Sequence, residues 1–183
     1  MDSRERLISA AGELLQRDGF SAMSPAAIQH RAGVGQGSMY HHFAGKRALA
    51  LEALQRNADR LLVSAEEALA SSGTPVDRVI AYLERERDPL LGCPVGRLAQ
   101  DRGVIDDPGL RALVAGLFAA LEQRIAEVLS EDESLSAPQE LAATVVAVLQ
   151  GGYVLARAAA DREPFDRALA GAIRLLRTTE GVH

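Results

Sequence analysis

The feature that most constrains the fold is a glycine-bearing segment at residues 33–49, which reads GVGQGSMYHHFAGKRAL. Gly33 is suited to end a helix, because glycine readily adopts the left-handed conformation that follows the last turn. The next residues predict a second short helix over about 36–43, in which Met39 and Phe43, four residues apart, face inward. Two short helices joined by a tight turn form a helix-turn-helix.

The outward side of the second short helix carries polar side chains. Gln36, Ser38, His41 and His42 all face away from the side that holds Met39. A short helix that presents such groups on an otherwise small apolar unit is typical of an element that enters the major groove of DNA. The alternative interpretation is that these are solvated polar residues on an exposed helix.

The rest of the chain is also predicted to be helical. Aromatic residues make up only 4% of it, residues that favour strands are few, and apolar residues recur at helical spacing behind Ser-Pro, Thr-Pro and Asp-Pro starts. We expect an all-α fold of about nine helices and no strand. The expected ranges are about 2–18, 24–33, 36–43, 46–70, 74–83, 95–101, 107–128, 138–160 and 164–179.

The charge is distributed unevenly along the chain. The net charge is −5, but residues 1–50 hold six basic and four acidic residues, whereas the remaining 133 hold 14 and 21. The first part is therefore +2 and the rest −7. This asymmetry allows a small basic face to approach phosphates while the larger part stays acidic.

The single cysteine, Cys93, excludes an internal disulfide framework and fits a reducing cytoplasm. No secretory signal is recognisable at the N-terminus. The longest uncharged run, residues 141–156, is shorter than the roughly 20 apolar residues of a membrane span, so we interpret it as a buried helix.

The chain resembles the TetR family of bacterial transcription regulators. The residues that carry the likeness are Gly37, Tyr40, Phe43 and Lys46 in the segment 33–49, supported by Phe20 and the helix start at Ser24. Segments 92–99 and 150–158 further resemble C-terminal regions of one branch of that family. The resemblance implies a homodimer with a DNA-binding domain at 1–47 and an effector-binding and dimerisation domain at 48–183. It also implies that a small-molecule effector spreads the two DNA-binding heads and releases the operator.

Two positions depart from the usual family pattern. The first is Gly35, where a Ser or Thr usually begins the recognition helix, and the second is Gln36, which is frequently basic. We therefore expect fewer backbone contacts here and more direct base reading, since Gln can bridge N6 and N7 of adenine. The predicted base-contacting residues are Gln36, Ser38, His41 and His42, the predicted phosphate-contacting residues are Ser24, Tyr40 and Lys46, and Gly37 is expected to allow close approach.

The effector pocket is expected in the larger helical part. Its candidate lining residues are Tyr82, Leu91, Cys93, Arg97, Phe118, Gln150, Tyr153 and Arg157. An apolar cavity with a few converging polar groups would suit a small hydrophobic or aromatic molecule. The apolar members can equally be core residues, and Arg157 can equally pair with Asp161.

Cys93 permits two interpretations. It lies in an irregular Gly-Cys-Pro segment, where a thiolate near Arg97 would sense electrophiles or oxidants. A free cysteine is also commonly a small buried apolar residue.

The helices at 138–160 and 164–179 are rich in Gly and Ala, and small faces allow close helix approach. We assign them to a two-fold, four-helix dimer interface; tight packing within one subunit is the alternative. His30, His41, His42 and His183 form no recognised metal-binding spacing, and no cofactor fingerprint is evident.

The resulting prediction is a DNA-binding repressor released from its operator by a small molecule, and not an enzyme. The alternatives are a thiol-sensing repressor that uses Cys93, an all-helical small-molecule-binding enzyme, and a helical protein-interaction module. No nucleophile, base and acid combination supports the enzyme. The interaction module would leave the outward face of the second short helix without a purpose.

Overall fold

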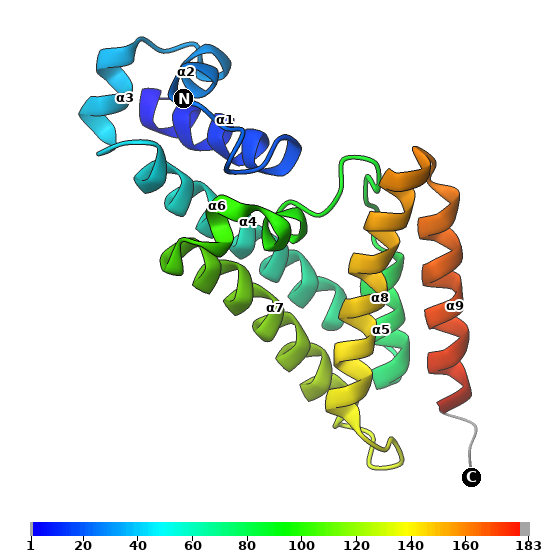
Figure 1. Ribbon diagram of the computed structural model, residues 1–183. Helices are drawn as coiled ribbons and strands as arrows, with labels where there is room; N and C mark the ends of the chain where they lie inside the picture. The colour runs from blue at the N-terminus through cyan, green and yellow to red at the C-terminus, as the bar shows by residue number, and fades with distance from the viewer. Residues whose placement is uncertain (1, 180–183) are drawn as a thin grey trace. The chain divides into compact units, whose positions relative to one another are not determined.

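The structure is a computed structural model that describes residues 2–179. Over this range the chain is helical and has no strand, which confirms the predicted all-α class (Figure 1). The nine α-helices and one 3-10 helix are α1 (Ser3–Arg17), α2 (Pro25–Ala32), α3 (Gln36–His42), α4 (Lys46–Leu69), α5 (Pro75–Glu84), η1 (Gly96–Gln100), α6 (Arg102–Ile105), α7 (Pro108–Leu129), α8 (Pro138–Ala159) and α9 (Glu163–Thr179).

The chain forms two compact units. The first comprises Met1–Arg60 and Cys93–Gly116, and the second comprises Leu61–Gly92 and Leu117–His183. Helices α4 and α7 each contribute residues to both units. The division at residue 47 that we expect from the sequence concerns function, and it stays a prediction.

Side-chain caps and prolines set several helix starts. The Asp2 carboxylate accepts from the backbone N–H of Glu5, and the Ser24 hydroxyl accepts from Ala27. Thr74 and Asp77 form a reciprocal capping box at the start of α5. Each cap satisfies backbone donors that have no partner inside the helix.

The first unit is built around the small core of α1, α2 and α3. Leu7, Leu15, Ile28 and Met39 are each no more than 1% exposed, and Phe43 closes the C-terminal end of α3. Burying each such side chain stabilises the unit by roughly 1.5–3 kcal/mol. Met39 and Phe43 are four residues apart and both buried, so they determine which side of α3 faces the interior.

The segment that follows Cys93 differs in detail from the expectation. The short helix expected at 95–101 is the 3-10 helix η1, and it is followed directly by α6, which the sequence pattern does not indicate. The Asp101 carboxylate begins α6 by accepting from the backbone N–H of Gly103. The same carboxylate accepts from the backbone N–H and hydroxyl of Ser21, so this segment is bonded to the turn between α1 and α2.

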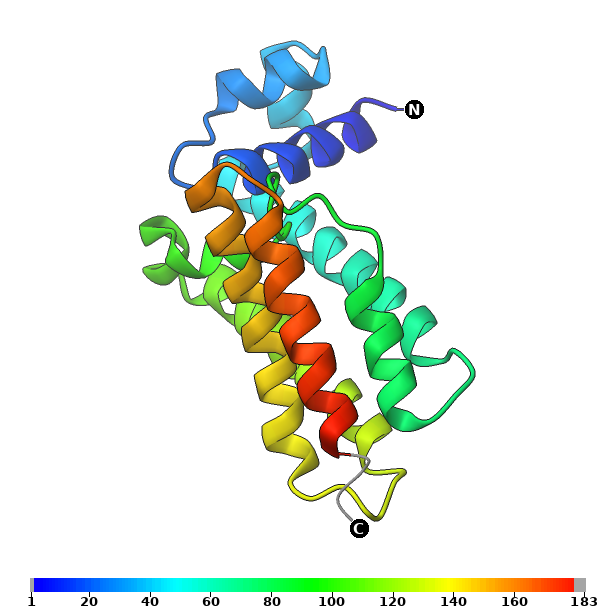
Figure 2. The ribbon, with the colours of Figure 1, turned by 90° about the vertical axis from the view of Figure 1, so that its right-hand side faces the viewer.

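In the second unit, α9 packs beside both α8 and α5 (Figure 2). The Tyr153 and Phe165 rings contact each other with centroids 4.9 Å apart, which joins α8 to α9. A Cβ at Gly152 would lie 3.0 Å from the Phe165 ring, so a larger residue here would crowd the packing of α8 against α9 within the subunit. The small residue at 152 therefore supports the intrasubunit interpretation.

Helix α8 is buried on one side only. Its inward residues include Val145 and Leu149, whereas Val154 and Leu155 are each 54% exposed. The prediction that residues 141–156 form a buried helix is therefore correct for one face of α8. Among the described residues, α8 is the one helix whose length and composition would allow a membrane crossing, a test that core helices of soluble proteins also pass.

Candidate nucleic-acid interface

Helices α2 and α3 and the turn between them form the predicted helix-turn-helix. Helix α2 ends at Gly33, whose φ of 62° is left-handed and whose N–H bonds back to the last turn. Gly35 then precedes α3 with an extended backbone and provides no side-chain cap. The guanidinium of Arg6, on α1, donates to the Gly33 carbonyl at 3.4 Å, so α1 holds the turn in place.

The buried side of α3 orients the opposite side outward. Met39 is fully buried, and its sulfur lies 3.6 Å from the side-chain nitrogen of Gln29 on α2. This anchoring leaves Gln36, Gly37, Tyr40 and His41 exposed and Ser38 part-buried. The structure thus brings most of the predicted DNA-contacting residues onto one accessible surface.

Gly37 and Tyr40 contribute little to the packing of the free protein. A Cβ built at Gly37 would meet no heavy atom within 4 Å, and Tyr40 is 52% exposed. Large exposed aromatic residues with a polar end are suited to contact a partner. Both positions are therefore available to DNA without a cost to the fold.

His42, Lys46 and Ser24 have contacts within the protein. The Nε2 atom of His42 lies 3.0 Å from the Ser3 hydroxyl, and Lys46 Nζ lies 4.3 Å from the centre of the Phe20 ring. Ser24 caps α2 and is exposed. These three side chains help to position the helices, and Lys46 is part-buried.

Most arginines of the first unit are paired with carboxylates. Arg4 pairs with Glu52, Arg31 with Glu13, Arg47 with Asp107, Arg56 with Glu5 and Arg17 with Asp18. Within residues 2–179, neither Arg6 nor Lys46 forms an ion pair. Arg6 is therefore a positive charge beside the helix-turn-helix that no carboxylate of the described chain pairs, and the sequence pattern did not single it out.

Comparison with known proteins identifies the family. Residues 7–53 match the family described as "Bacterial regulatory proteins, tetR family", and residues 68–170 match "Transcriptional regulator LmrA/YxaF-like, C-terminal domain". The chain belongs to the TetR family. It is therefore a DNA-binding transcriptional regulator, as the helix-turn-helix indicates.

Relatives and solved structures agree with this assignment. The chain is 27% identical to the regulator YxaF and 28% identical to the regulator LmrA, both from Bacillus subtilis (strain 168), over 89% of this chain and 89% and 90% of theirs. A TetR regulator from Chloroflexus aurantiacus J-10-FL has a similar structure, with a TM-score of 0.85 and 25% identity over 96% of this chain and 94% of that one. The reduced form of E. coli NemR gives a TM-score of 0.81 at 25% identity over 93% and 95%.

The predicted effector-binding residues of this TetR regulator divide between the two units. Tyr82, Leu91, Phe118, Gln150, Tyr153 and Arg157 belong to the second unit, and Cys93 and Arg97 to the first. Arg157 donates to the Leu91 carbonyl at 3.3 Å and forms no ion pair with Asp161 among the described contacts. Tyr82 and Tyr153 are buried, whereas Leu91 is 41% exposed.

Cys93 and Arg97 lie in the segment that contacts the α1–α2 turn. Cys93 is 7% exposed, and Arg97 donates to the backbone carbonyl of Arg17. The burial of the thiol favours the packing interpretation of Cys93. Among residues 2–179, no group of His, Cys, Asp and Glu side chains is arranged to hold a metal ion, and His183 lies outside the described residues.

Proposed function

We propose that this TetR-family protein is a repressor that reads its operator with α3 and is released by a small-molecule effector. The observation that carries the proposal is the exposed face of α3, whose residues contribute nothing to the core. Gln36, Ser38 and His41 would contact base edges, and Gly37 would allow the backbone to approach closely. Residues 1–47 would form the DNA-binding domain and residues 48–183 the effector and dimerisation domain.

The phosphate contacts would come from Tyr40, Lys46, Ser24 and the N-terminal turn of α3. His42 has its Nε2 atom beside Ser3, so we assign it to positioning α3 rather than to reading bases. Because most nearby arginines are already paired, few counterions would be released on binding. The affinity should therefore fall less steeply with salt than it does for strongly basic DNA-binding proteins.

A homodimer through α8 and α9 would place two recognition helices on one operator. The supporting feature is an apolar groove of about 440 Å³ along these helices, which is lined by Val148, Gly171 and Leu175 among others. Leu175 is 67% exposed, and a Cβ at Gly151 or Gly171 would meet nothing within 4 Å. A second copy of the same face would bury this apolar surface.

The effector would bind in the helical second unit, where Tyr82, Phe118 and Tyr153 supply aromatic surface. Binding releases DNA only if the effector prefers the conformation that does not fit the operator. We propose that the chain acts by binding and not by catalysis, and that it functions in the cytoplasm, as its relatives are transcriptional regulators. We keep thiol sensing by Cys93 as a second candidate; one similar solved structure is described as the reduced form of E. coli NemR.

The test is binding of the purified protein to its own upstream DNA in a mobility-shift assay, with a salt titration. Tyr40→Ala should weaken binding to every bound sequence alike, because it removes a phosphate contact without disturbing the core. Gln36→Ala should instead reduce the preference for the operator over unrelated duplex. If Tyr40→Ala changed sequence preference, the division of roles would be wrong.

A failure on upstream DNA would be followed by selection from randomised duplexes, since an operator can lie elsewhere. A protein that bound no selected sequence would not be a DNA-binding repressor. The matched control is Arg102→Ala, because Arg102 is exposed and pairs only with the neighbouring Asp106. This variant should bind the operator as the wild type does.

A further inference from the structure

The C-terminal end of α5 holds an arginine whose charge is not balanced. Arg85 is part-buried in the second unit, where it donates to the Ser64 hydroxyl at 2.7 Å and lies 5.1 Å from the centre of the Tyr82 ring. Its Nε atom is buried and has no hydrogen-bond acceptor. Burying a donor of a charged group without an acceptor is costly, so this arrangement requires an explanation.

No carboxylate neutralises Arg85 in the described part of the chain. The flanking residues Glu84 and Glu86 form no ion pair with it among the described contacts, and the charge of Glu67 on α4 affects its pKa less than burial does. Burial, and next the like charge of Arg87, lower the pKa of the Arg85 guanidinium. The environment therefore disfavours the charge that this side chain carries.

The second arginine at this end of α5 donates to three backbone carbonyls. Arg87 donates to the backbone carbonyls of Tyr82, Leu83 and Arg85, which are carbonyls that the end of the helix leaves exposed. It also lies 5.2 Å from the centre of the same Tyr82 ring. Arg87 is thus explained as a cap of α5, and it adds a like charge on the ring that Arg85 also contacts.

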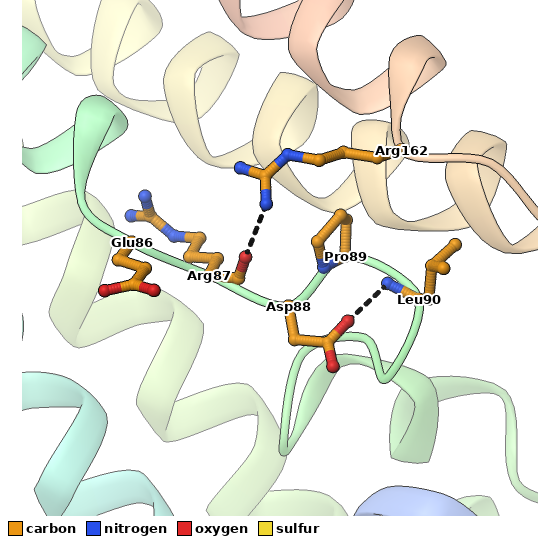
Figure 3. A pocket seen from close by; sticks show the side chains of 6 residues that line it. All are labelled: Glu86, Arg87, Asp88, Pro89, Leu90 and Arg162. Atoms are coloured by element: carbon orange, nitrogen blue, oxygen red, sulfur yellow. Dashed lines mark hydrogen bonds between the residues drawn. The ribbon is translucent and has the colours of Figure 1, made fainter.

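The nearby surface crevice does not explain the unbalanced charge. This crevice of about 490 Å³ is lined by Arg87, Asp88 and Arg162 among others (Figure 3). Arg162 pairs with Asp166 and donates to the Arg87 carbonyl, and Asp88 accepts from the N–H groups of Leu90 and Leu91. Arg87, Asp88 and Arg162 in this crevice therefore have partners, whereas the Nε atom of Arg85 has none.

We propose that Arg85 binds an anionic group of the effector, most simply a carboxylate. The inference rests on the proposed effector-regulated function and narrows the expected ligand from apolar or aromatic to an acid that carries an apolar or aromatic body. The carboxylate would accept from the Nε atom of Arg85 and pair with its charge, and Ser64 would hold the guanidinium in position. Tyr82 and Tyr153 would provide the aromatic surface beside it.

A purely structural role does not explain why Arg85 carries a buried charge. Its one hydrogen bond from α5 to α4 ends on a neutral hydroxyl, and a neutral donor would make the same bond without burying a charge. The structural and ligand-binding roles predict opposite effects on the stability of the free protein. If Arg85 serves to bind a ligand, Arg85→Met should raise the Tm of the free protein by about 2–4 °C, because it removes an unbalanced buried charge. If Arg85 instead links α5 to α4, the same substitution should lower Tm.

Arg78→Met on the same helix is the matched control. Arg78 pairs with Glu131 and donates to the Leu69 carbonyl at 2.6 Å, so its loss leaves both groups without a partner and should lower Tm. A fall in Tm for Arg85→Met as large as that for Arg78→Met would overturn the proposal.

The direct test follows the Nε–Hε resonance of Arg85 by ¹⁵N NMR of the full-length protein. The resonance is assigned by its disappearance in Arg85→Lys, which keeps the positive charge. Sodium acetate and sodium benzoate should shift it saturably at tens of millimolar, and benzamide, the neutral analogue of benzoate, should not. A resonance that neither anion moves, beyond the change produced by sodium chloride at equal ionic strength, would overturn the proposal.

Failure of this inference is separable from failure of the proposed function. Arg85→Lys and Arg85→Met leave the outward face of α3 unchanged, so both should bind operator DNA as tightly as the wild type. Loss of anion binding with operator binding intact would reject the anionic effector alone. Absence of operator binding by the wild type would reject the repressor itself.

Discussion

Single residues whose side chains do nothing for the fold are the best guide to where DNA is read. On α3, Gly37 has open space around its Cα and Tyr40 points away from the core, whereas Met39 between them is fully buried. Packing therefore explains Met39 and leaves the other two unexplained. The proposed contact with DNA would explain both, and substitutions at these positions should then affect stability and DNA binding differently.

Gly37→Ala is expected to stabilise the protein and weaken DNA binding. Alanine is favoured over glycine in a helix by roughly 0.5–1 kcal/mol, and its methyl group meets nothing in the free protein. The same methyl group would separate α3 from the DNA, and we expect a loss of operator affinity of about tenfold, or about 1.4 kcal/mol. Tm and a mobility-shift titration measure the two effects.

The matched control for Gly37→Ala is Gly116→Ala, at an exposed position of α7 with equally open space. It should raise Tm and leave operator affinity unchanged. Unchanged affinity in Gly37→Ala as well would mean that the backbone of α3 does not approach DNA closely.

Cys93 is expected to react slowly with thiol reagents in the native protein. Because the residue is 7% exposed, labelling by a disulfide reagent requires local opening. We expect the native rate to be at least about tenfold below the rate in urea, which corresponds to about 1.4 kcal/mol of opening. Equal rates in the two conditions would favour the thiol-sensing alternative, which Cys93→Ala would then test by operator release with an electrophile.

At the scale of helices, cap residues specify the boundaries and also link parts of the chain that are distant in sequence. Asp107 begins α7 by accepting from the backbone N–H groups of Gly109 and Leu110. The same carboxylate pairs with Arg47 on α4, so the two helices share one charged group. The hydrogen bond from Arg47, and then that from Leu110, lower the pKa of Asp107 to about 2.

Asp107→Asn should lower stability at neutral pH by an amount that disappears in acid. A carboxyl with a lowered folded-state pKa adds stability above its unfolded pKa of about 3.9 and loses it as the pH falls toward about 2. Urea unfolding at pH 7, 4 and lower should therefore show the wild type and the variant converging below pH 4. A constant difference across this range would show that the charge of Asp107 is not what stabilises the contact.

Asp106→Asn is the control for this helix start. Its carboxylate pairs with Arg102, whose side chain is 82% exposed, and such pairs contribute little. The variant should match the wild type at every pH.

The sequence predicted helices well where a local signal marks them. Ser24-Pro25 and Thr74-Pro75 give both a side-chain cap and a proline, and the helices begin there. Helix α6 has four residues with Gly103 among them, too few to show a periodic pattern. It depends on the bond between Asp101 and Ser21, 80 residues apart, and such contacts are not readable from spacing.

In the candidate sites too, local spacing was informative and contacts between distant residues were not predictable. Helical spacing predicted that four residues face outward, because Met39 and Phe43 fix the buried side. They are Gln36 and His41, which are exposed, and Ser38 and His42, which are part-buried. It did not predict the contact of His42 with Ser3, which joins α3 to α1. Sequence alone does not single out Arg85, because the run Glu84-Arg85-Glu86-Arg87-Asp88 has the pattern of solvated, mutually paired charges.

At the scale of the whole molecule, the proposed function requires two copies. A single α3 helix buries too little surface to select one operator. Two α3 helices held in one dimer contact half-sites about 34 Å apart, and binding of the first makes binding of the second intramolecular and therefore stronger. The surface proposed for this purpose is the apolar groove along α8 and α9, in which Leu175 is exposed on one subunit. Dimerisation and operator affinity should therefore be lost together.

Leu175→Glu is expected to separate the dimer and to weaken operator binding without unfolding the subunit. Leu175 is 67% exposed in the subunit, so a charged side chain there is hydrated in the monomer but would be buried without a partner between two copies. Sedimentation should show the wild type as a dimer and the variant as a monomer at micromolar concentration, with a matching loss of the operator complex. Leu90→Glu, at another exposed leucine that lies outside α8 and α9, should remain dimeric and bind DNA normally. A Leu175→Glu variant that stayed dimeric would place the two-fold interface on a different face, and operator binding by a true monomer would remove the need for an interface.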